Sequence, residues 1–313
     1  IFPGQGSQKI GMGKELAKAY PEARAVFESV DEALDQNLSR LVWEGDLKEL
    51  TLTENAQPAI MANSMAILVA LKTEGFELSS IDFVAGHSLG EYTAFCAADA
   101  ITIADTAKLL KIRGRAMQVC DNEGKGSMAA ILGLTFDEVQ KIVDEASTST
   151  SCQIANDNDP AQIVISGYKD AVERAMDFAK IKGAKRALAL NVSAPFHSKL
   201  MDPAAEVMRE ALSSIRISKP MIPVVMNTQA KDIADPVLIK KCLIDQVAGM
   251  VRWRESINYM NVQGVNKFYE LGEGKSLSGM VKRTVNEVQT ISVSAPEEII
   301  STMEKIKDDA TQK

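Results

Sequence analysis

Ser88 is the central residue of the segment GHSLG at residues 86–90, a G-x-S-x-G pattern that can present a serine as a nucleophile. The pattern does so only in a sharp turn between a strand and a helix. The apolar residues 81–85 predict a buried strand before it, and residues 91–98 predict a helix after it. We therefore interpret the segment as a nucleophile elbow, with a glycine-rich turn and a capping serine as the purely structural alternative.

A serine nucleophile needs a base with a pKa near neutrality, and histidine is the usual one. The chain has only two histidines, His87 and His197. His87 adjoins Ser88, and neighbouring side chains on a tight turn point apart, so we expect it to be a poor base for this serine. His197 follows an expected strand in a loop, where functional residues are common, and is the candidate base by elimination.

Two further glycine-rich segments resemble nucleotide-binding motifs only in part. Residues 4–6 (GQG) follow a strand-like opening, but the third glycine of a dinucleotide fingerprint would fall at Lys9. Residues 272–276 (GEGKS) imitate the end of a P-loop, but its first glycine would fall at Tyr269. We therefore predict neither a dinucleotide fingerprint nor a nucleotide triphosphate site, and interpret residues 4–6 as a loop that can offer backbone N–H groups to an anion.

The composition indicates a globular protein with a sizeable core. Of the 313 residues, 46% are hydrophobic and 25% are charged, which are ordinary values for such proteins. The formal net charge of −7 argues against a nucleic-acid-binding protein. It does not exclude an anionic ligand, because a local basic group can act within an acidic total.

The cysteines favour a reducing, cytoplasmic location. Cys96, Cys120, Cys152 and Cys242 are far apart and form no C-x-x-C pair, a pattern typical of free thiols and not of a disulfide framework or a zinc site. No apolar run has transmembrane length, and no signal peptide is visible. The sequence opens at Ile1 inside an expected strand, without an initiator methionine. We therefore expect a short N-terminal piece to be missing, which leaves a plastid or the mitochondrial matrix open as locations.

Strands and helices alternate over most of the chain, which is typical of a mostly parallel sheet covered by helices on both faces. Apolar periodicity predicts long helices at residues 14–45, 53–71, 103–119, 200–214, 236–260 and from 296, and short apolar runs predict strands at residues 81–85, 223–227, 267–271 and 290–293.

The segment between Ser88 and His197 contains an inserted unit of another kind. Its elements follow the order βαββαβ of a ferredoxin-like fold, and Asn156–Pro160 (NDNDP) predicts the turn between its second and third strands. We expect a discontinuous large α/β subdomain at residues 1–123 and 194–313, with the small ferredoxin-like subdomain at residues 124–193. The expected strands of the small subdomain are 127–134, 151–155, 161–167 and 184–192, and its helices are 135–146 and 169–182.

Several segments, taken together and in this order, closely resemble the bacterial-type malonyl-CoA:acyl-carrier-protein transacylase family of fatty-acid synthesis. They are FPGQGSQ at 2–8, GHSLGE at 86–91, RG at 113–114 with MQ at 117–118, GSMAA at 126–130, PAQIVISG at 160–167, APFHS at 194–198, and ELG at 270–272 with GK at 274–275.

The resemblance implies a hydrolase-like α/β subdomain with a ferredoxin-like insertion and an active site in the cleft between them. It also implies ping-pong transfer: Ser88 attacks the thioester of malonyl-CoA, coenzyme A leaves, and the phosphopantetheine thiol of holo acyl carrier protein takes the malonyl group. We expect no cofactor, no metal ion, and neither nucleic acid nor a membrane as a partner.

The remaining site residues follow from this resemblance and from what the chemistry requires. The oxyanion of a tetrahedral intermediate needs two preset donors, and the N–H groups of Gln5 and Leu89 suit that role. By resemblance, the backbone carbonyl of Gln246 orients the imidazole of His197. Arg113 supplies the planar fork that would bind the malonyl carboxylate through two hydrogen bonds.

Two other functions remain open at this stage. A serine hydrolase, such as an esterase or thioesterase, usually has the chain order Ser…Asp/Glu…His and would leave Arg113 without a task. A catalytically silent acyl-binding or docking module would not need Ser88, His197 and Arg113 together. The same sequence predicts that Arg115, two positions along the helix from Arg113, points away from the site.

Overall fold

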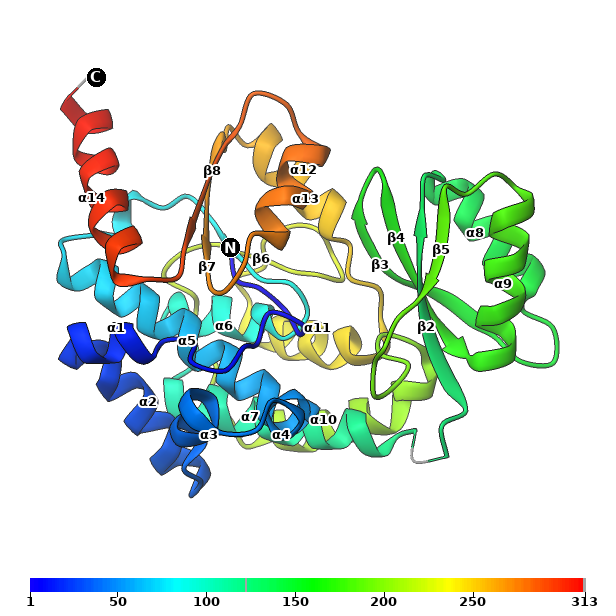
Figure 1. Ribbon diagram of the computed structural model, residues 1–313, viewed down its shortest axis with the longest axis horizontal. Coiled ribbons are helices and arrows are strands. Elements are labelled where there is room, and N and C mark those ends of the chain that lie inside the picture. Colours follow the sequence, from blue (N-terminus) through cyan, green and yellow to red (C-terminus); the bar gives the residue numbers. More distant parts are fainter. Residues whose placement is uncertain (122, 312–313) are drawn as a thin grey trace.

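Short parallel strands form the centre of the larger part of the protein, as predicted (Figure 1). The computed structural model describes residues 1–121 and 123–311. In it, β1 (Val84–Ala85) pairs with β6 (Val224–Val225), and β7 (Lys267–Leu271) pairs with β8 (Gln289–Val293), both in parallel.

The first two residues of the chain join these two pairs of strands. The Phe2 N–H donates to the carbonyl of Ala85 at 2.9 Å, and the Leu271 N–H donates to the carbonyl of Ile1 at 3.1 Å. Backbone hydrogen bonds therefore run across the order β8, β7, residues 1–2, β1 and β6. This arrangement brings the loop that follows Phe2 to the same edge as the turn that follows β1.

Helices surround these strands (Figure 1). The helix α5 (Thr53–Thr73) is buried along nearly its whole length, as its continuous apolar pattern predicts. No helix in the described part of the chain is long and apolar enough to cross a membrane. The other helices of this part are α1 (Lys14–Ala19), α2 (Pro21–Leu34), α3 (Leu38–Glu44), α4 (Leu47–Thr51), α6 (Gly90–Ala97), α7 (Ile103–Val119), α10 (Asp202–Ser213), α11 (Pro236–Ala248), α12 (Trp253–Val262), α13 (Ser276–Thr284) and α14 (Pro296–Thr311), with 3-10 turns at Leu78–Ser80 and Lys199–Met201.

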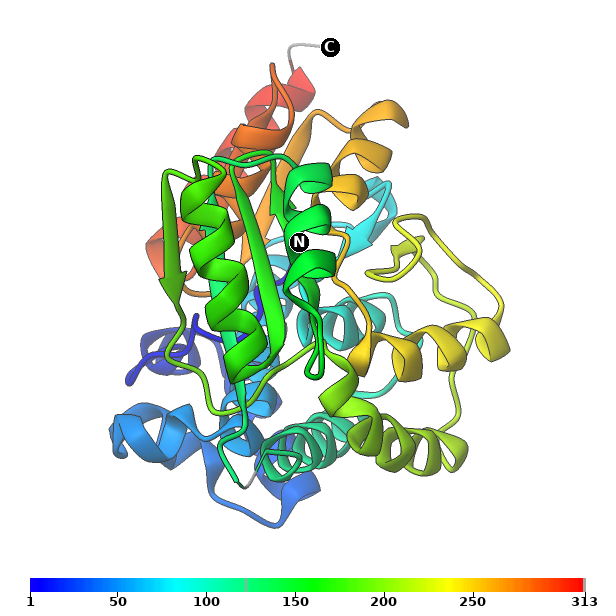
Figure 2. The same ribbon diagram turned by 90° about the vertical axis from the view of Figure 1, so that its right-hand side faces the viewer.

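A second α/β unit is inserted after α7, and we call it the small unit. Its elements are β2 (Gly126–Leu132), α8 (Phe136–Ala146), β3 (Cys152–Asp159), β4 (Gln162–Tyr168), α9 (Lys169–Ile181) and β5 (Arg186–Ala189). The strand order is β3-β4-β2-β5 with every neighbour antiparallel, and α8 and α9 lie side by side on one face (Figure 2). This is the expected ferredoxin-like arrangement, and it has a hydrophobic core of its own. The subdomain boundaries at residues 123–124 and 193–194 stay a prediction.

Two helices predicted as continuous are interrupted. The expected helix at residues 14–45 is α1, α2 and α3, because Tyr20 is extended before Pro21 and Asp35 adopts a left-handed conformation with φ 46°. The expected helix at residues 236–260 is α11 and α12, since Gly249 is extended between them. The chain leaves the helical conformation here because Val251 pairs with Asn156 of the small unit.

The predicted turn at Asn156–Pro160 is wrong, because residues 156–159 lie in β3. The strand is bulged at two points but continues to Asp159, and β4 begins at Gln162. The Asp157 N–H donates to the carbonyl of Val251 at 2.9 Å, and the Val251 N–H donates to the carbonyl of Ala155 at 2.8 Å. Pairing with the larger part of the protein therefore holds a turn-like composition in an extended strand.

Two ion pairs fix the small unit against the larger part. The guanidinium of Arg254 on α12 bonds the carboxylate of Asp157 at 2.8 Å, and that of Arg283 on α13 bonds Asp159 at 2.8 Å. Both aspartate side chains are fully buried, whereas the two arginine side chains are 29% and 49% exposed. Removal of either arginine would therefore leave a buried charge unpaired, whereas removal of either aspartate would leave a charge that water can reach.

This asymmetry predicts which substitution destabilises the protein more. Arg254→Met leaves the buried Asp157 carboxylate without its counter-charge and should lower the free energy of unfolding by about 3 kcal/mol. Asp157→Asn leaves a guanidinium that water can reach and should cost only about 1 kcal/mol. Urea unfolding of the two variants measures the difference, and equal losses would contradict this account of the junction.

Candidate active site

The turn between β1 and α6 forces Ser88 into a strained conformation. Its φ is 54°, a left-handed value that is uncommon for serine. The flanking glycines are required by close approach: a Cβ on Gly86 would lie 1.8 Å from the carbonyl oxygen of Gly90, and a Cβ on Gly90 would lie 2.4 Å from that of Phe2. The G-x-S-x-G segment is therefore an elbow of the expected geometry.

Ser88 and His197 are in direct contact. The Ser88 Oγ lies 2.7 Å from Nε2 of His197, although the two residues are 109 positions apart in the sequence. The other ring nitrogen, Nδ1, donates to the backbone carbonyls of Gln246 at 2.9 Å and Gly249 at 3.1 Å. These carbonyls accept only, so they fix the tautomer in which the lone pair of Nε2 faces the serine hydroxyl.

His197 is kept neutral by its surroundings. Its side chain is buried, and burial together with the charge of Arg113 lowers the pKa of His197 to about 3, although the two carbonyl hydrogen bonds oppose this shift. The imidazole is therefore neutral at physiological pH, and the lone pair of its Nε2 is available to the proton of Ser88.

His87 is turned away from the nucleophile, as expected. Its Nε2 lies 2.9 Å from Oδ1 of Asn158 in the small unit, and its ring packs edge-on against Trp253 with centroids 5.6 Å apart. Burial lowers the pKa of His87 as well. This histidine connects the elbow to the small unit.

Arg113 on α7 lies beside the nucleophile in a fully buried position. One of its terminal nitrogens, Nη2, donates to Ser88 Oγ at 3.2 Å and to Oε1 of Gln246 at 2.8 Å, and Nη1 donates to Oε1 of Gln57 at 2.9 Å. The ring of Tyr92 lies 5.7 Å from the guanidinium carbon. Within the described part of the chain, Nε of Arg113 has no hydrogen-bond partner.

The contacts of Arg113 leave its charge poorly compensated. Gln57, Gln246 and Ser88 are all neutral, and burial lowers the pKa of the guanidinium. A planar guanidinium binds a carboxylate through two parallel hydrogen bonds, and Nη2 of this one lies beside the Ser88 hydroxyl. The site is therefore suited to an anionic group placed next to the serine.

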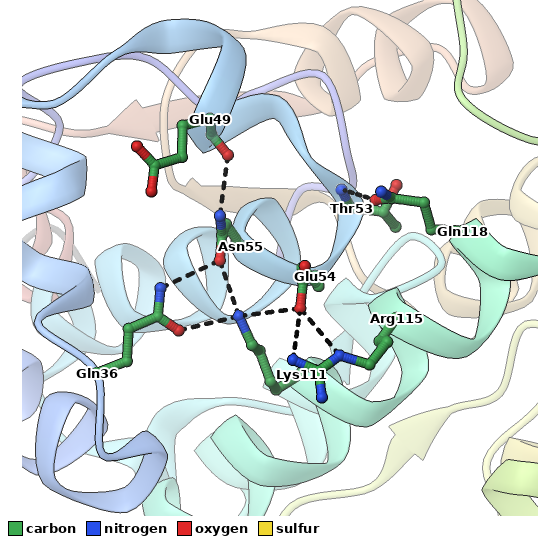
Figure 3. A network of polar contacts seen from close by, with 8 residues as sticks. All are labelled: Gln36, Glu49, Thr53, Glu54, Asn55, Lys111, Arg115 and Gln118. Atoms are coloured by element: carbon green, nitrogen blue, oxygen red, sulfur yellow. Dashed lines mark hydrogen bonds and ion pairs between the residues drawn. The ribbon is translucent and has the colours of Figure 1, made fainter.

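Arg115 points away from the site, as expected, and takes part in a surface network (Figure 3). Its Nη2 lies 3.0 Å from Oε2 of Glu54, and Nζ of Lys111 lies 3.3 Å from the same oxygen. Nearby, the Thr53 N–H donates to Oε1 of Gln118 at 3.0 Å. These contacts attach α7 to the first turn of α5, and Arg115 itself is 68% exposed.

The two expected oxyanion donors both have free N–H groups. Leu89 directly precedes α6, and Gln5 lies in the turn after the strand-like start of the chain. Among the hydrogen bonds of the described residues, none is donated by the backbone N–H of Gln5 or Leu89. Gln5 and Ser88 line the same cavity, which measures about 250 Å³.

This cavity lies between the two parts of the protein. The larger part contributes Gln57 and Met117, and the small unit contributes Met128 and Asn156. Phe196 lines it as well, next to His197 in the sequence. The wall thus combines apolar side chains with polar groups that include Ser88, His197 and Arg113, as is typical of a site that orients a small ligand.

Three buried polar residues near the serine were not singled out from the sequence. Gln57 lies in the apolar helix α5, Glu91 in the apolar helix α6, and Asn227 just beyond β6, each almost fully buried. The signal that could have identified them is a polar residue within an otherwise apolar element, because such groups must find partners when buried. Asn227 accepts a hydrogen bond from the Ser88 N–H at 2.8 Å and donates to the Gly86 carbonyl at 2.7 Å.

Comparisons with known proteins agree with this architecture. The family described as "Acyl transferase domain" matches residues 1–313. The malonyl CoA-acyl carrier protein transacylase of Bacillus subtilis is 45% identical over 310 residues, which cover 99% of this chain and 97% of that protein.

Solved structures agree in fold as well. The acyl-carrier-protein-S-malonyltransferase of Bartonella henselae is 48% identical, with a TM-score of 0.95 and 98% of each chain covered. A malonyl-transacylase solved in complex with a type II PKS acyl-carrier protein is 38% identical, with a TM-score of 0.94 and coverage of 97% of this chain and 98% of that one. The chain therefore belongs to the malonyl CoA-acyl carrier protein transacylase family.

Proposed function

We infer that this protein transfers a malonyl group from malonyl-CoA to the phosphopantetheine thiol of holo acyl carrier protein, and so supplies fatty-acid chain elongation. The observation that carries this assignment is the position of Arg113, whose Nη2 lies 3.2 Å from the Ser88 Oγ. A buried guanidinium at that distance suits an acyl group that ends in a carboxylate. The proposal includes a cytoplasmic location, which the four free thiols support.

In the first half-reaction, Ser88 Oγ attacks the thioester carbon of malonyl-CoA while Nε2 of His197 takes the hydroxyl proton. The carbonyl oxygen becomes an oxyanion, which the N–H groups of Gln5 and Leu89 are suited to stabilise. When the intermediate collapses, the carbon–sulfur bond breaks and coenzyme A leaves with the proton from His197. The product is a malonyl ester on Ser88.

The second half-reaction uses the same groups in the reverse order. Nε2 of His197 takes the proton of the phosphopantetheine thiol, and the sulfur attacks the ester carbon. The bond to Ser88 Oγ breaks, and the serine recovers its proton from His197. The imidazole returns to the neutral form after each half-reaction because it passes the proton that it took from the attacking group to the leaving group.

Arg113 selects the substrate in this proposal. With a malonyl group on Ser88, its carboxylate would lie against the guanidinium, whose Nη2 is next to the Ser88 hydroxyl. A neutral acyl group would leave the buried charge without a counter-ion, which is costly. The hydrolase alternative gives this arginine no task, and a silent module has no need of the aligned Ser88–His197 pair.

The covalent intermediate is the direct test of this function. Mass spectrometry after mixing with malonyl-CoA should find one malonyl group on Ser88, and Ser88→Ala should abolish both the adduct and transfer to carrier protein. His197→Ala should slow acylation about 100-fold, the usual contribution of a general base. Rapid release of free malonate without transfer would favour the hydrolase, and no adduct would favour the module.

Another nucleophile would also overturn the assignment. Cys96 is the nearest cysteine in the sequence, but burial raises the pKa of its thiol to about 12, which makes it unreactive. The Ser88→Ala protein should therefore carry no malonyl group on any cysteine.

Substitution of Arg113 should change substrate preference. Arg113→Ala removes both the attraction for malonyl and the penalty against neutral acyl groups, so acylation by malonyl-CoA should fall by about 100-fold while acetyl-CoA gains relative to it. Arg113→Lys should restore little, because an ammonium group cannot form the planar fork. Rates of acyl-enzyme formation with the two thioesters measure the ratio.

Arg115→Ala is the matched control for Arg113→Ala. It removes an arginine from the same helix, but one that is paired with Glu54 on the surface. The ratio of malonyl to acetyl acylation should not change in this variant. A change in preference here, and none in Arg113→Ala, would show that the wrong arginine had been chosen.

The pKa of His197 gives a pH-dependent test. The imidazole should remain neutral at pH 5 in NMR spectra, and Arg113→Ala should raise the pKa of His197 because the nearby cation is removed. His87 is the internal control, since its lowered pKa comes from burial and not from Arg113.

The same pKa shift of His197 affects stability. Because the imidazole of His197 binds its proton near pH 6.5 in the unfolded chain and near pH 3 in the folded protein, the free energy of unfolding should decline as the pH falls between these values.

A further inference from the structure

Glu91 is a buried carboxyl group directly behind the nucleophile, and the mechanism above does not use it. Its side chain is 0% exposed on α6. Oε1 accepts a hydrogen bond from the Asn227 N–H at 2.6 Å, and Oε2 accepts one from Nε2 of Gln246 at 2.7 Å. Each oxygen of Glu91 thus faces a donor.

The side-chain amide of Gln246 lies between Glu91 and Arg113. Its Nε2 donates to Glu91 and to the Ser88 carbonyl at 2.7 Å, while its Oε1 accepts from Nη2 of Arg113 at 2.8 Å. Only one orientation of the amide satisfies these contacts. If the amide were reversed, its NH2 group would face the guanidinium and its oxygen would face the oxygens of Glu91 and Ser88.

The backbone cannot relieve such a reversal. The Asn227 N–H that binds Glu91 belongs to the segment after β6, where the Asn227 carbonyl accepts from the Arg252 N–H at 2.9 Å. The Ser88 carbonyl belongs to the strained elbow. Both groups are held by their surroundings. Oε2 of Glu91 and the Ser88 carbonyl together orient the amide of Gln246, and of these two acceptors only Oε2 belongs to a side chain that a substitution can change.

We propose that Glu91 is a positioning residue that orients the amide of Gln246, and through it the guanidinium of Arg113, and thereby sets the preference of the enzyme for a malonyl group. This inference rests on the proposed function. Glu91 touches neither the substrate nor the reacting atoms. Its effect reaches Arg113 through two hydrogen bonds in series, Glu91 to Gln246 and Gln246 to Arg113.

Glu91→Gln tests the proposal with almost no change in shape. The new side chain has one acceptor and one donor where Glu91 offers two acceptors, so one contact of the network must fail. If its oxygen stays on the Asn227 N–H, its NH2 group meets Nε2 of Gln246. The amide of Gln246 then either turns over, so that Arg113 loses its acceptor, or stays in place against the opposing NH2 group, so that it holds Arg113 less firmly.

The expected result is a change in selectivity. The ratio of malonyl-CoA to acetyl-CoA acylation should fall about tenfold, in line with one lost hydrogen bond to a charged group, with KM for malonyl-CoA raised more than kcat is lowered. Gln246→Met removes the side-chain amide that connects Glu91 to Arg113. It keeps the backbone carbonyl that orients His197, and it should lower the ratio of malonyl to acetyl acylation to a similar extent. In the double variant the two effects should not add, because both act on one path.

Glu270→Gln is the matched control for a buried glutamate. Glu270 is also 0% exposed, and its two oxygens accept from the backbone N–H groups of Leu277 at 3.0 Å and Ser278 at 2.7 Å at the start of α13. Its substitution should lower stability to a similar extent and leave the ratio of malonyl to acetyl acylation unchanged. A purely structural role for Glu91 would make the two variants behave alike.

The outcomes separate this inference from the proposed function. If the wild-type protein loads malonyl and acetyl groups equally, the proposed function fails. If the wild type prefers malonyl and folded Glu91→Gln keeps the full ratio, the function stands and the role of Glu91 is refuted. Should Glu91→Gln not fold, an unchanged ratio in Gln246→Met gives the same refutation.

Discussion

The buried positive charge of Arg113 is the constraint on which the rest of the active site depends. A guanidinium removed from water is costly unless it finds acceptors, and those around Arg113 are neutral: Gln57, Gln246 and the hydroxyl of Ser88. Neutral acceptors stabilise the charge only in part, so an incoming carboxylate can still gain from binding it. A protein carboxylate in direct contact would occupy the place of the substrate.

The same charge explains why a backbone carbonyl, and not an aspartate, orients His197. An aspartate beside this imidazole would lie close to Arg113 and would compete with the substrate for it. The carbonyls of Gln246 and Gly249 fix the tautomer without adding a charge. Burial and the charge of Arg113 together keep the pKa of His197 low, so that Arg113 acts on both the substrate and the base.

The sequence predicted those parts of the structure that depend on local geometry. The elbow at Ser88 follows from glycine spacing between a strand and a helix, and the small unit follows from its element order. The buried partners Gln57 and Asn227 could not be found in this way, because Asn227 meets the elbow across 139 positions. The prediction of a turn at the NDNDP segment was wrong for the same reason, since the conformation of this segment depends on Val251 and two distant arginines.

The extended conformation of this segment in β3 also explains why the active site forms where the two parts of the protein meet. β3 places Asn156 in the wall of the cavity and Asn158 on His87, while the neighbouring aspartates bind α12 and α13. The residue before the nucleophile is thus held by the small unit, and the nucleophile itself by the larger part through Asn227. A shift of the small unit would move His87 and strain the elbow, so correct docking of the two parts is a condition for an aligned Ser88.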